Sequence, residues 1–224
     1  MPSTRLTLLA VAHGTRSATG QKQIRDLVAA VARRRPEVDI RLSYADVQQP
    51  RIGEVVPTVR AAVVVPLLLS AGFHVRVDIA RAVDGTRFPV TAPLGPDDVL
   101  LDSLARHLPA DADADAVVLA AAGSSDPGWR ASVAATARSL GGAHVGYVSG
   151  SSPSVAEVVA GLREQGARRI AIAAYLLAEG LFYRTLHRAG ADSVTPPLAL
   201  DPAVVPLVVR RYESALLTTA PARM

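Results

Sequence analysis

Short apolar runs alternate with segments of helical period along the whole chain. Between Gln21 and Arg35, apolar side chains recur at three- and four-residue spacing, which predicts one buried stripe on an otherwise polar helix. Strands are expected near 5–12, 39–45, 61–69 and 89–93, and helices near 20–35, 50–60, 75–84 and 97–107. This alternation is typical of a parallel sheet covered by helices on both faces.

The second half of the chain repeats the same order of elements. Strands are expected near 115–121, 143–148, 168–176 and 194–199, and helices near 128–140, 153–165, 181–190 and 202–216. The polar stretch Pro109 to Asp115 has no pattern of its own and is interpreted as a linker. We therefore expect an α/β fold with two similar lobes, residues 1–110 and 111–224. Each lobe should hold a four-stranded parallel sheet flanked by helices, with the active cleft between them.

Composition narrows the possible functions. The longest apolar runs fall short of the roughly 18 to 20 residues that a membrane span needs, so no membrane segment is expected. The N-terminus has no signal-peptide pattern, and we expect a cytoplasmic protein. A scattered net charge of +4 does not favour nucleic acid. Because the chain has no cysteine, any metal must be held by imidazole and oxygen ligands.

Three side chains that could bind a metal or accept a proton follow the predicted strands of the first half. His13 comes after the first strand, Asp46 after the second, and His74 a few residues after the third. The carboxyl ends of parallel strands share one edge of a sheet, where ligands usually bind. We expect the three to meet if the three strands are neighbours.

The second half lacks all three groups. Ala122, Ser149 and Phe182 occupy the matching positions of the repeat. The fold therefore does not require the histidines or the aspartate, which weakens a purely structural explanation for them.

The chain resembles the class II tetrapyrrole chelatases, specifically the sirohydrochlorin chelatases. The resemblance covers nearly all of the chain and lies above all in His13-Gly14-Thr15-Arg16 after the first strand and Gly72-Phe73-His74 after the third. It extends to Tyr44-Ala45-Asp46, although relatives carry glutamate where this chain has the shorter Asp46. Members of this family insert Fe²⁺ or Co²⁺ into sirohydrochlorin without ATP, on the way to siroheme or cobalamin.

The resemblance implies roles for particular residues. His13 and His74 would bind the incoming metal and take up the pyrrole protons, with help from Asp46. The second half would only close over the macrocycle. Sirohydrochlorin carries carboxylate side chains, so arginines are expected at the rim of its site and apolar surface beneath the ring. The rim candidates are Arg16, Arg76, Arg51 and Arg184, and Gly72, Phe73, Leu181, Phe182 and Tyr183 are candidates for the floor.

Two rival functions conflict with the sequence. A histidine phosphatase would need arginine directly before its histidine, where this chain has Ala12. A dinucleotide-binding protein would need a glycine pattern after the first strand, and this chain does not have that pattern there. A non-catalytic carrier of tetrapyrrole or metal remains an alternative, because it would use the same cleft without turnover.

For a chelatase, Fe²⁺ is the favoured metal substrate, with Co²⁺ as the alternative and Ni²⁺ also compatible with such ligands. No prosthetic group is expected, and a duplicated chain favours a monomer.

Overall fold

The computed structural model describes residues 6–70, 73–109 and 114–219, and for residues 73–76, 218 and 219 it describes the backbone alone. The chain divides into two compact units. Unit 1 consists of Met1–Gly95 together with Ala203–Met224, and unit 2 is Pro96–Pro202. The prediction of an α/β fold with two lobes built on parallel sheets is confirmed.

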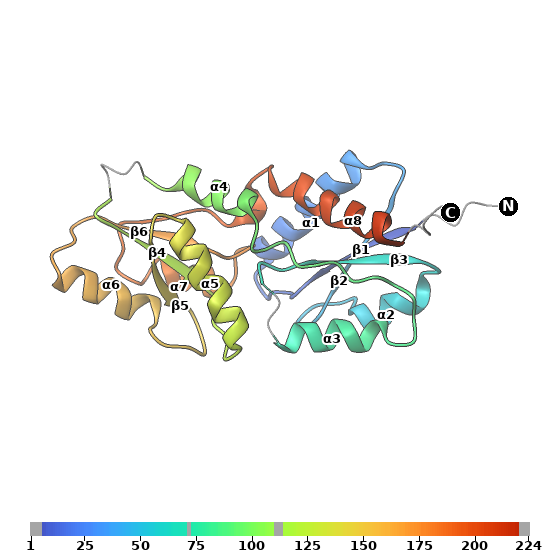
Figure 1. Ribbon diagram of the computed structural model, residues 1–224, viewed down its shortest axis with the longest axis horizontal. Coiled ribbons are helices and arrows are strands. Elements are labelled where there is room, and N and C mark those ends of the chain that lie inside the picture. Colours follow the sequence, from blue (N-terminus) through green and yellow to red (C-terminus); the bar gives the residue numbers. More distant parts are fainter. Residues whose placement is uncertain (1–5, 71–72, 110–113, 220–224) are drawn as a thin grey trace. The chain divides into compact units, whose positions relative to one another are not determined.

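Unit 1 is a parallel sheet of three strands, with helices on both faces (Figure 1). Its elements are β1 (Thr7–Ala12), α1 (Ala18–Arg34), β2 (Asp39–Tyr44), α2 (Ile52–Val55), the 3₁₀ helix η1 (Val56–Thr58), β3 (Ala62–Leu67), α3 (Phe73–Val83) and α8 (Val204–Thr219). The strand order is β2-β1-β3, so β1 lies in the centre. Helices α1 and α8 cover one face of the sheet, and α2 and α3 cover the other.

The central strand and the first helix form for simple reasons. All six residues of β1 are buried, as expected for a strand covered on both faces. Helix α1 begins at the N-cap residue Ser17, whose hydroxyl accepts a hydrogen bond from the Gly20 N–H. Its stripe of Ile24, Leu27 and Val31 is buried in unit 1.

Unit 2 repeats this design with a sheet of order β5-β4-β6-β7. Its elements are α4 (Asp98–His107), β4 (Ala116–Ala121), α5 (Pro127–Ser139), β5 (His144–Tyr147), α6 (Val155–Glu164), β6 (Ile170–Ala174), α7 (Leu181–Leu186), β7 (Ser193–Val194) and η3 (Leu198–Leu200). Every strand pair is parallel. Helix α6 packs on β4 and β5, and α7 packs on β6.

The first sheet is smaller than predicted. We expected a fourth strand near 89–93, but this segment forms only an isolated bridge between Val90 and Val64. Pro89 and Pro93 flank it, and proline has no N–H to donate to a strand ladder. The fourth strand of unit 2 is likewise short, only Ser193–Val194.

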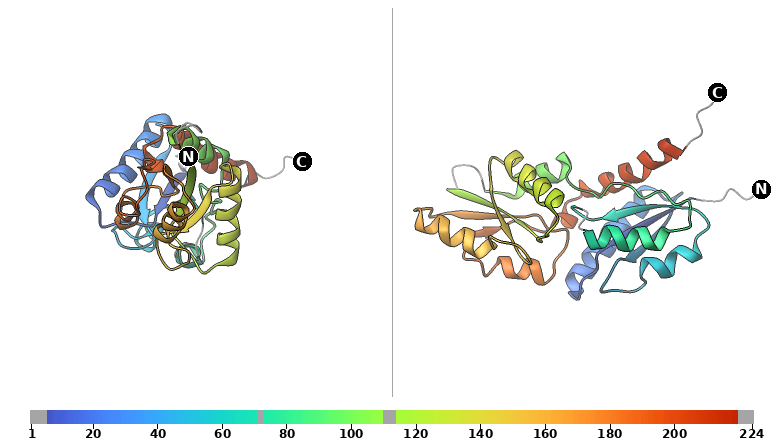
Figure 2. Two further views of the ribbon diagram at one scale, coloured as in Figure 1. Left: turned by 90° about the vertical axis from the view of Figure 1, so that its left-hand side faces the viewer. Right: turned by 60° about the horizontal axis from the view of Figure 1, so that its bottom comes forward.

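The spatial units are divided differently from the two sequence halves, for which the expected boundary lay at residue 110. Helix α4 ends the first half of the sequence but belongs to unit 2, where it contacts η3. Helix α8 ends the second half but belongs to unit 1, where it packs on α1 and β3 (Figures 1 and 2). The Tyr212 hydroxyl of α8 donates to the Leu6 carbonyl, which secures the helix beside the start of β1. Within the described ranges, no helix is long and apolar enough to cross a membrane.

Candidate metal site at the carboxyl edge of the first sheet

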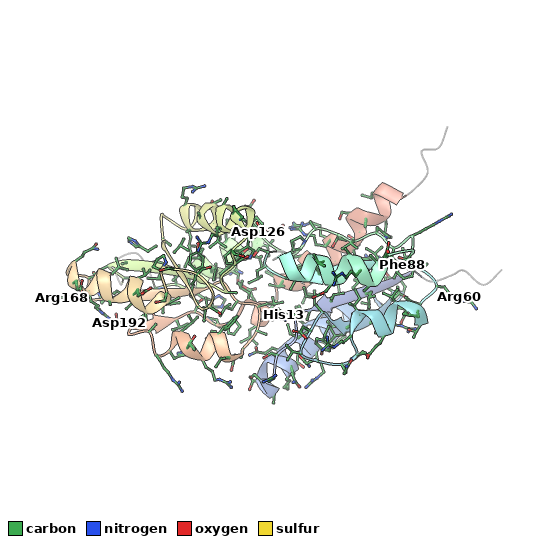
Figure 3. The ribbon with its side chains drawn as sticks, turned by 90° about the horizontal axis from the view of Figure 1, so that it is seen from below. His13, Arg60, Phe88, Asp126, Arg168 and Asp192 are labelled. Atoms are coloured by element: carbon green, nitrogen blue, oxygen red, sulfur yellow. The ribbon has the colours of Figure 1, made fainter. Side chains whose placement is uncertain are left out.

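Two of the three candidate ligands lie side by side, directly beyond β1 and β2. The Asp46 N–H donates to the His13 carbonyl at 3.0 Å, one step past the Ala45 to Ala12 hydrogen bond at 2.9 Å. Figure 3 labels His13 at this end of β1. Both side chains are exposed to solvent. The predicted convergence of His13 and Asp46 thus follows from the pairing of their strands.

Gly14 allows the two loops to approach this closely. Its φ is +99°, and a Cβ atom at this position would lie 2.4 Å from the carbonyl oxygen of Asp46. Only glycine adopts such a backbone conformation without cost and leaves room for the neighbouring peptide. Val47 follows with φ +61°, an unusual value for a β-branched residue, so the turn after β2 carries local strain.

A glutamine that sequence reasoning did not single out also joins these loops. The side-chain oxygen of Gln48 accepts from the Thr15 N–H at 2.9 Å, and the Gln21 amide donates to the Thr15 carbonyl. The loop after β2 is thereby held against the loop after β1. Nothing in the sequence marks Gln48, because its role depends on a pairing between distant residues.

The surroundings of Asp46 favour its ionised form. The Val47 N–H, followed by the positive charge of the Arg51 guanidinium, keeps the pKa of Asp46 below its ordinary value. The charge of Arg16, and that of His13 when its ring is protonated, acts on that pKa in the same direction. Arg51 Nη2 lies 3.3 Å from Asp46 Oδ1. Asp46 is therefore a carboxylate at neutral pH, the form that binds a divalent cation.

The third candidate ligand is placed only by its backbone. His74 is the second residue of α3, which begins six residues after β3 ends. Since β3 pairs with β1, α3 starts from the same edge of the sheet as the His13 loop. The side chains of Phe73, His74 and Arg76 and all of Gly72 lie outside the described residues. Among the residues that the structure does describe, no three His, Asp or Glu side chains form a metal cluster.

The two remaining rim candidates are exposed. Arg16 lies in the loop after β1, close enough for its charge to act on Asp46. Arg184 lies on α7 of unit 2, where Phe182 is also exposed. Tyr183, named as a floor candidate, is instead buried in the core of unit 2, and its hydroxyl donates to the Thr195 carbonyl.

Unit 2 preserves the loop scaffold of this site without its chemistry. The Ser149 N–H donates to the Ala122 carbonyl at 2.9 Å, the counterpart of the Asp46 to His13 hydrogen bond. Gly123 has φ +104°, and a Cβ there would lie 1.7 Å from the Ser149 carbonyl oxygen. The proposed matches of Ala122 with His13 and of Ser149 with Asp46 are thus confirmed in the structure.

Comparison with known proteins identifies the family. The family model described as CbiX matches this chain twice, over residues 7–110 and 116–215. The sirohydrochlorin cobaltochelatase of Methanococcoides burtonii is 26% identical over 120 residues, which cover 45% of this chain and 92% of that protein. The enzyme of the same name from Methanosarcina barkeri is 25% identical over 117 residues, covering 44% of this chain and 90% of that protein. Each relative thus corresponds in length to about one half of this chain.

Solved structures with the same fold extend over both halves. SirB from Bacillus subtilis with Fe³⁺ is 20% identical and has a TM-score of 0.75, covering 94% of this chain and 95% of that chain. The sirohydrochlorin chelatase SirB from Bacillus subtilis subspecies spizizenii in complex with cobalt is also 20% identical, with a TM-score of 0.76 over 96% of this chain and 97% of that chain. At this identity they establish the fold. The chain belongs to the CbiX family, and the resemblance drawn from its motifs is confirmed.

Proposed function

We propose that this protein is a sirohydrochlorin chelatase, which inserts a divalent metal into the tetrapyrrole without ATP. One observation carries the proposal: the loops after β1 and β2 hold an imidazole and an ionised carboxylate together at the carboxyl edge of the sheet, in a chain of the CbiX family. Both curated relatives are named sirohydrochlorin cobaltochelatases, which supports the same ring as substrate.

In this proposal, His13, Asp46 and His74 bind the metal substrate. Nitrogen and oxygen ligands suit Fe²⁺, Co²⁺ and Ni²⁺, and an incomplete ligand set leaves positions at which the ring nitrogens can take the metal over. Insertion also releases two pyrrole N–H protons. Neutral imidazoles accept protons near pH 7, so His13 and His74 are the proposed bases.

Ring binding is assigned to three arginines and to the segment that precedes His74. Arg16 and Arg76 are proposed to pair with carboxylates of the ring, and Arg184 of unit 2 is proposed as a further carboxylate contact. Gly72 and Phe73 are proposed to support the ring itself. The exposure of Arg16 and Arg184 is compatible with these roles.

The metal is proposed to be Fe²⁺ or Co²⁺. Siroheme synthesis, the more widespread need, favours Fe²⁺, whereas the names of both curated relatives favour Co²⁺. The donor atoms do not discriminate, because a histidine and carboxylate set binds both ions. Initial rates at limiting concentrations of each metal decide between them.

The test is anaerobic absorbance of sirohydrochlorin mixed with Fe²⁺ or Co²⁺, with and without protein. Wild-type protein should accelerate metallation, and His13→Ala should lower the rate by about 10²-fold or more, since it removes both a ligand and a base. His144→Ala is the matched control, because His144 is exposed on β5 of unit 2. Tight ring binding with no rate above the protein-free mixture would overturn the enzyme and leave a carrier.

A further inference from the structure

Arg51 forms an ion pair with Asp46, whose carboxylate is a proposed ligand of the metal. Its Nη2 atom lies 3.3 Å from Asp46 Oδ1, and 51% of the Arg51 side chain and 57% of the Asp46 side chain are exposed. An ion pair this open to solvent is weak and easily exchanged. The guanidinium is thus a removable partner of Asp46.

The position of Arg51 is not explained by the helix that it precedes. Arg51 is the N-cap residue of α2, but a guanidinium has no acceptor atom and cannot cap backbone N–H groups. In unit 2 the matching residue is Ser154, whose hydroxyl accepts from the Glu157 N–H at 3.2 Å. Tyr44 forms the same backbone bridge to Arg51 as Tyr147 forms to Ser154, which fixes the correspondence. Arginine therefore takes a place where serine serves the helix better.

The arginine and the acid are present or absent together. Unit 1 has Asp46 and Arg51, whereas unit 2 has Ser149 and Ser154 at the same places of the same scaffold. A structural need of the loop would persist in both units. Arg51 is instead found only in the unit that has the candidate ligand Asp46, which points to a role of Arg51 at Asp46.

The guanidinium also has space to move. Arg51 lines an open surface depression of about 360 Å³ beside α2 and α3, and Glu54 and Asp78 are among the other residues that line it. These carboxylates offer a displaced guanidinium a second favourable position. Arg81 lines the same depression, so a matched cation is available for comparison.

We propose that Arg51 is a built-in competitor of the metal for Asp46, a positioning residue that keeps metal affinity low enough for transfer to the ring. The proposal rests on the proposed function, in which Asp46 is a metal ligand. An arriving divalent cation attracts the carboxylate more strongly than a single guanidinium charge does, so the ion pair opens. The nearby positive charge then continues to oppose tight retention of the cation. A site that held the ion too firmly would fail to release it.

The test is a titration of the whole chain with Co²⁺, in which the visible absorption of the bound ion measures the fraction bound. Arg51→Gln should bind Co²⁺ about three- to tenfold more tightly than wild type at low salt, and the gain should shrink at high salt. Arg51→Lys should stay near wild type because it keeps the charge. Arg81→Gln should not change the affinity. In an Asp46→Asn background, the gain from Arg51→Gln should be smaller, because competition for the carboxylate is gone and only the repulsion between the two positive charges remains.

Turnover supplies a second readout. With the metal site saturated, Arg51→Gln should lower kcat for metallation while the KM for the metal falls, because a more tightly held ion leaves more slowly. A loss of folding would not raise metal affinity. Unchanged or weaker Co²⁺ binding by a folded Arg51→Gln variant would overturn the role of Arg51 and leave the chelatase proposal standing. Absence of Co²⁺ binding by the wild type would overturn both.

Discussion

Replacing Gly14 with alanine tests the close contact on which the candidate site depends. The new Cβ atom would lie 2.4 Å from the Asp46 carbonyl oxygen, at a residue whose φ is +99°. Contacts below 3.0 Å are not tolerated, so the Asp46 peptide must retreat by at least about 0.6 Å. The Asp46 N–H is bonded to the His13 carbonyl, so the movement disturbs both candidate ligands.

The expected loss of stability in Gly14→Ala is the sum of two costs. An alanine held at this φ costs about 1–3 kcal/mol in backbone strain. Pushing apart packed groups costs about 1–3 kcal/mol more, and relaxation of the loops relieves part of both. We expect the free energy of unfolding to fall by about 2–4 kcal/mol, which lowers Tm by roughly 5–15 °C in a chain of this size. Displaced ligands should also lower Co²⁺ affinity about tenfold.

Thermal unfolding, monitored by circular dichroism, measures the loss of stability. Titration with Co²⁺ measures the loss of affinity. Gly53→Ala is the control for the substitution itself, because its Cβ would meet nothing within 4 Å in helix α2. It should be neutral or stabilising by up to about 1 kcal/mol. Gly123→Ala is the control for position, because its Cβ would lie 1.7 Å from the Ser149 oxygen. It should destabilise at least as much as Gly14→Ala and leave Co²⁺ affinity unchanged.

Two outcomes would refute this reasoning. If Gly14→Ala unfolds at the same temperature as Gly53→Ala, the loops after β1 and β2 do not approach as closely as described. If Gly123→Ala weakens Co²⁺ binding as much as Gly14→Ala does, the ligands are not confined to unit 1.

Two further predictions concern unit 2. Ala122→His combined with Ser149→Asp should add a second, weaker Co²⁺ site, because the loop scaffold there matches that of unit 1. An unchanged number of Co²⁺ ions bound per chain would contradict this prediction. The Ile170 N–H, followed by the Arg163 side chain, lowers the pKa of Asp192 below its ordinary value of 3.8. The stability from Asp192 is therefore present above that value and lost as pH falls through the lower folded pKa. Thermal unfolding between pH 7 and 2.5 should show a smaller acid loss in Asp192→Asn than in wild type, and parallel curves would contradict the assignment.

The order of elements was predictable because local pattern determines it. Buried parallel strands such as β3, in which all six residues are buried, appear in the sequence as continuous apolar runs. Prediction failed where proline intervened. Pro89 and Pro93 keep the fourth segment of unit 1 out of the ladder, and Pro57 lies where the helix expected over 50–60 becomes the 3₁₀ helix η1.

The assignment of helices to units could not be predicted in this way. An amphipathic pattern shows that a helix has a buried face, but it does not identify the sheet that covers that face. Helix α8 is fixed in unit 1 by its own side chains. Arg211 donates to the carbonyls of Pro93 and Leu94, and Tyr212 donates to Leu6. These contacts join residues more than a hundred positions apart, beyond the reach of local pattern.

The candidate site was predictable to the extent that strand topology determines it. His13 and Asp46 meet because their strands are neighbours and parallel, which the pattern favoured. The partnership of Asp46 with Arg51 depends instead on the turn between them, where Val47 adopts φ +61°. Such a conformation is rare for valine, so no rule of sequence would have placed the two charges together.

The duplication separates what the fold needs from what the proposed chemistry needs. Both units keep the glycine at positive φ and the same hydrogen bond between loops, 3.0 Å long in unit 1 and 2.9 Å in unit 2. These shared features hold the edge of each sheet together. His13, Asp46 and Arg51 are replaced by alanine or serine at the matching positions of unit 2, so stability of the scaffold does not account for them. A substitution at a shared feature should therefore act first on folding, and a substitution at an unshared residue should act first on metal binding.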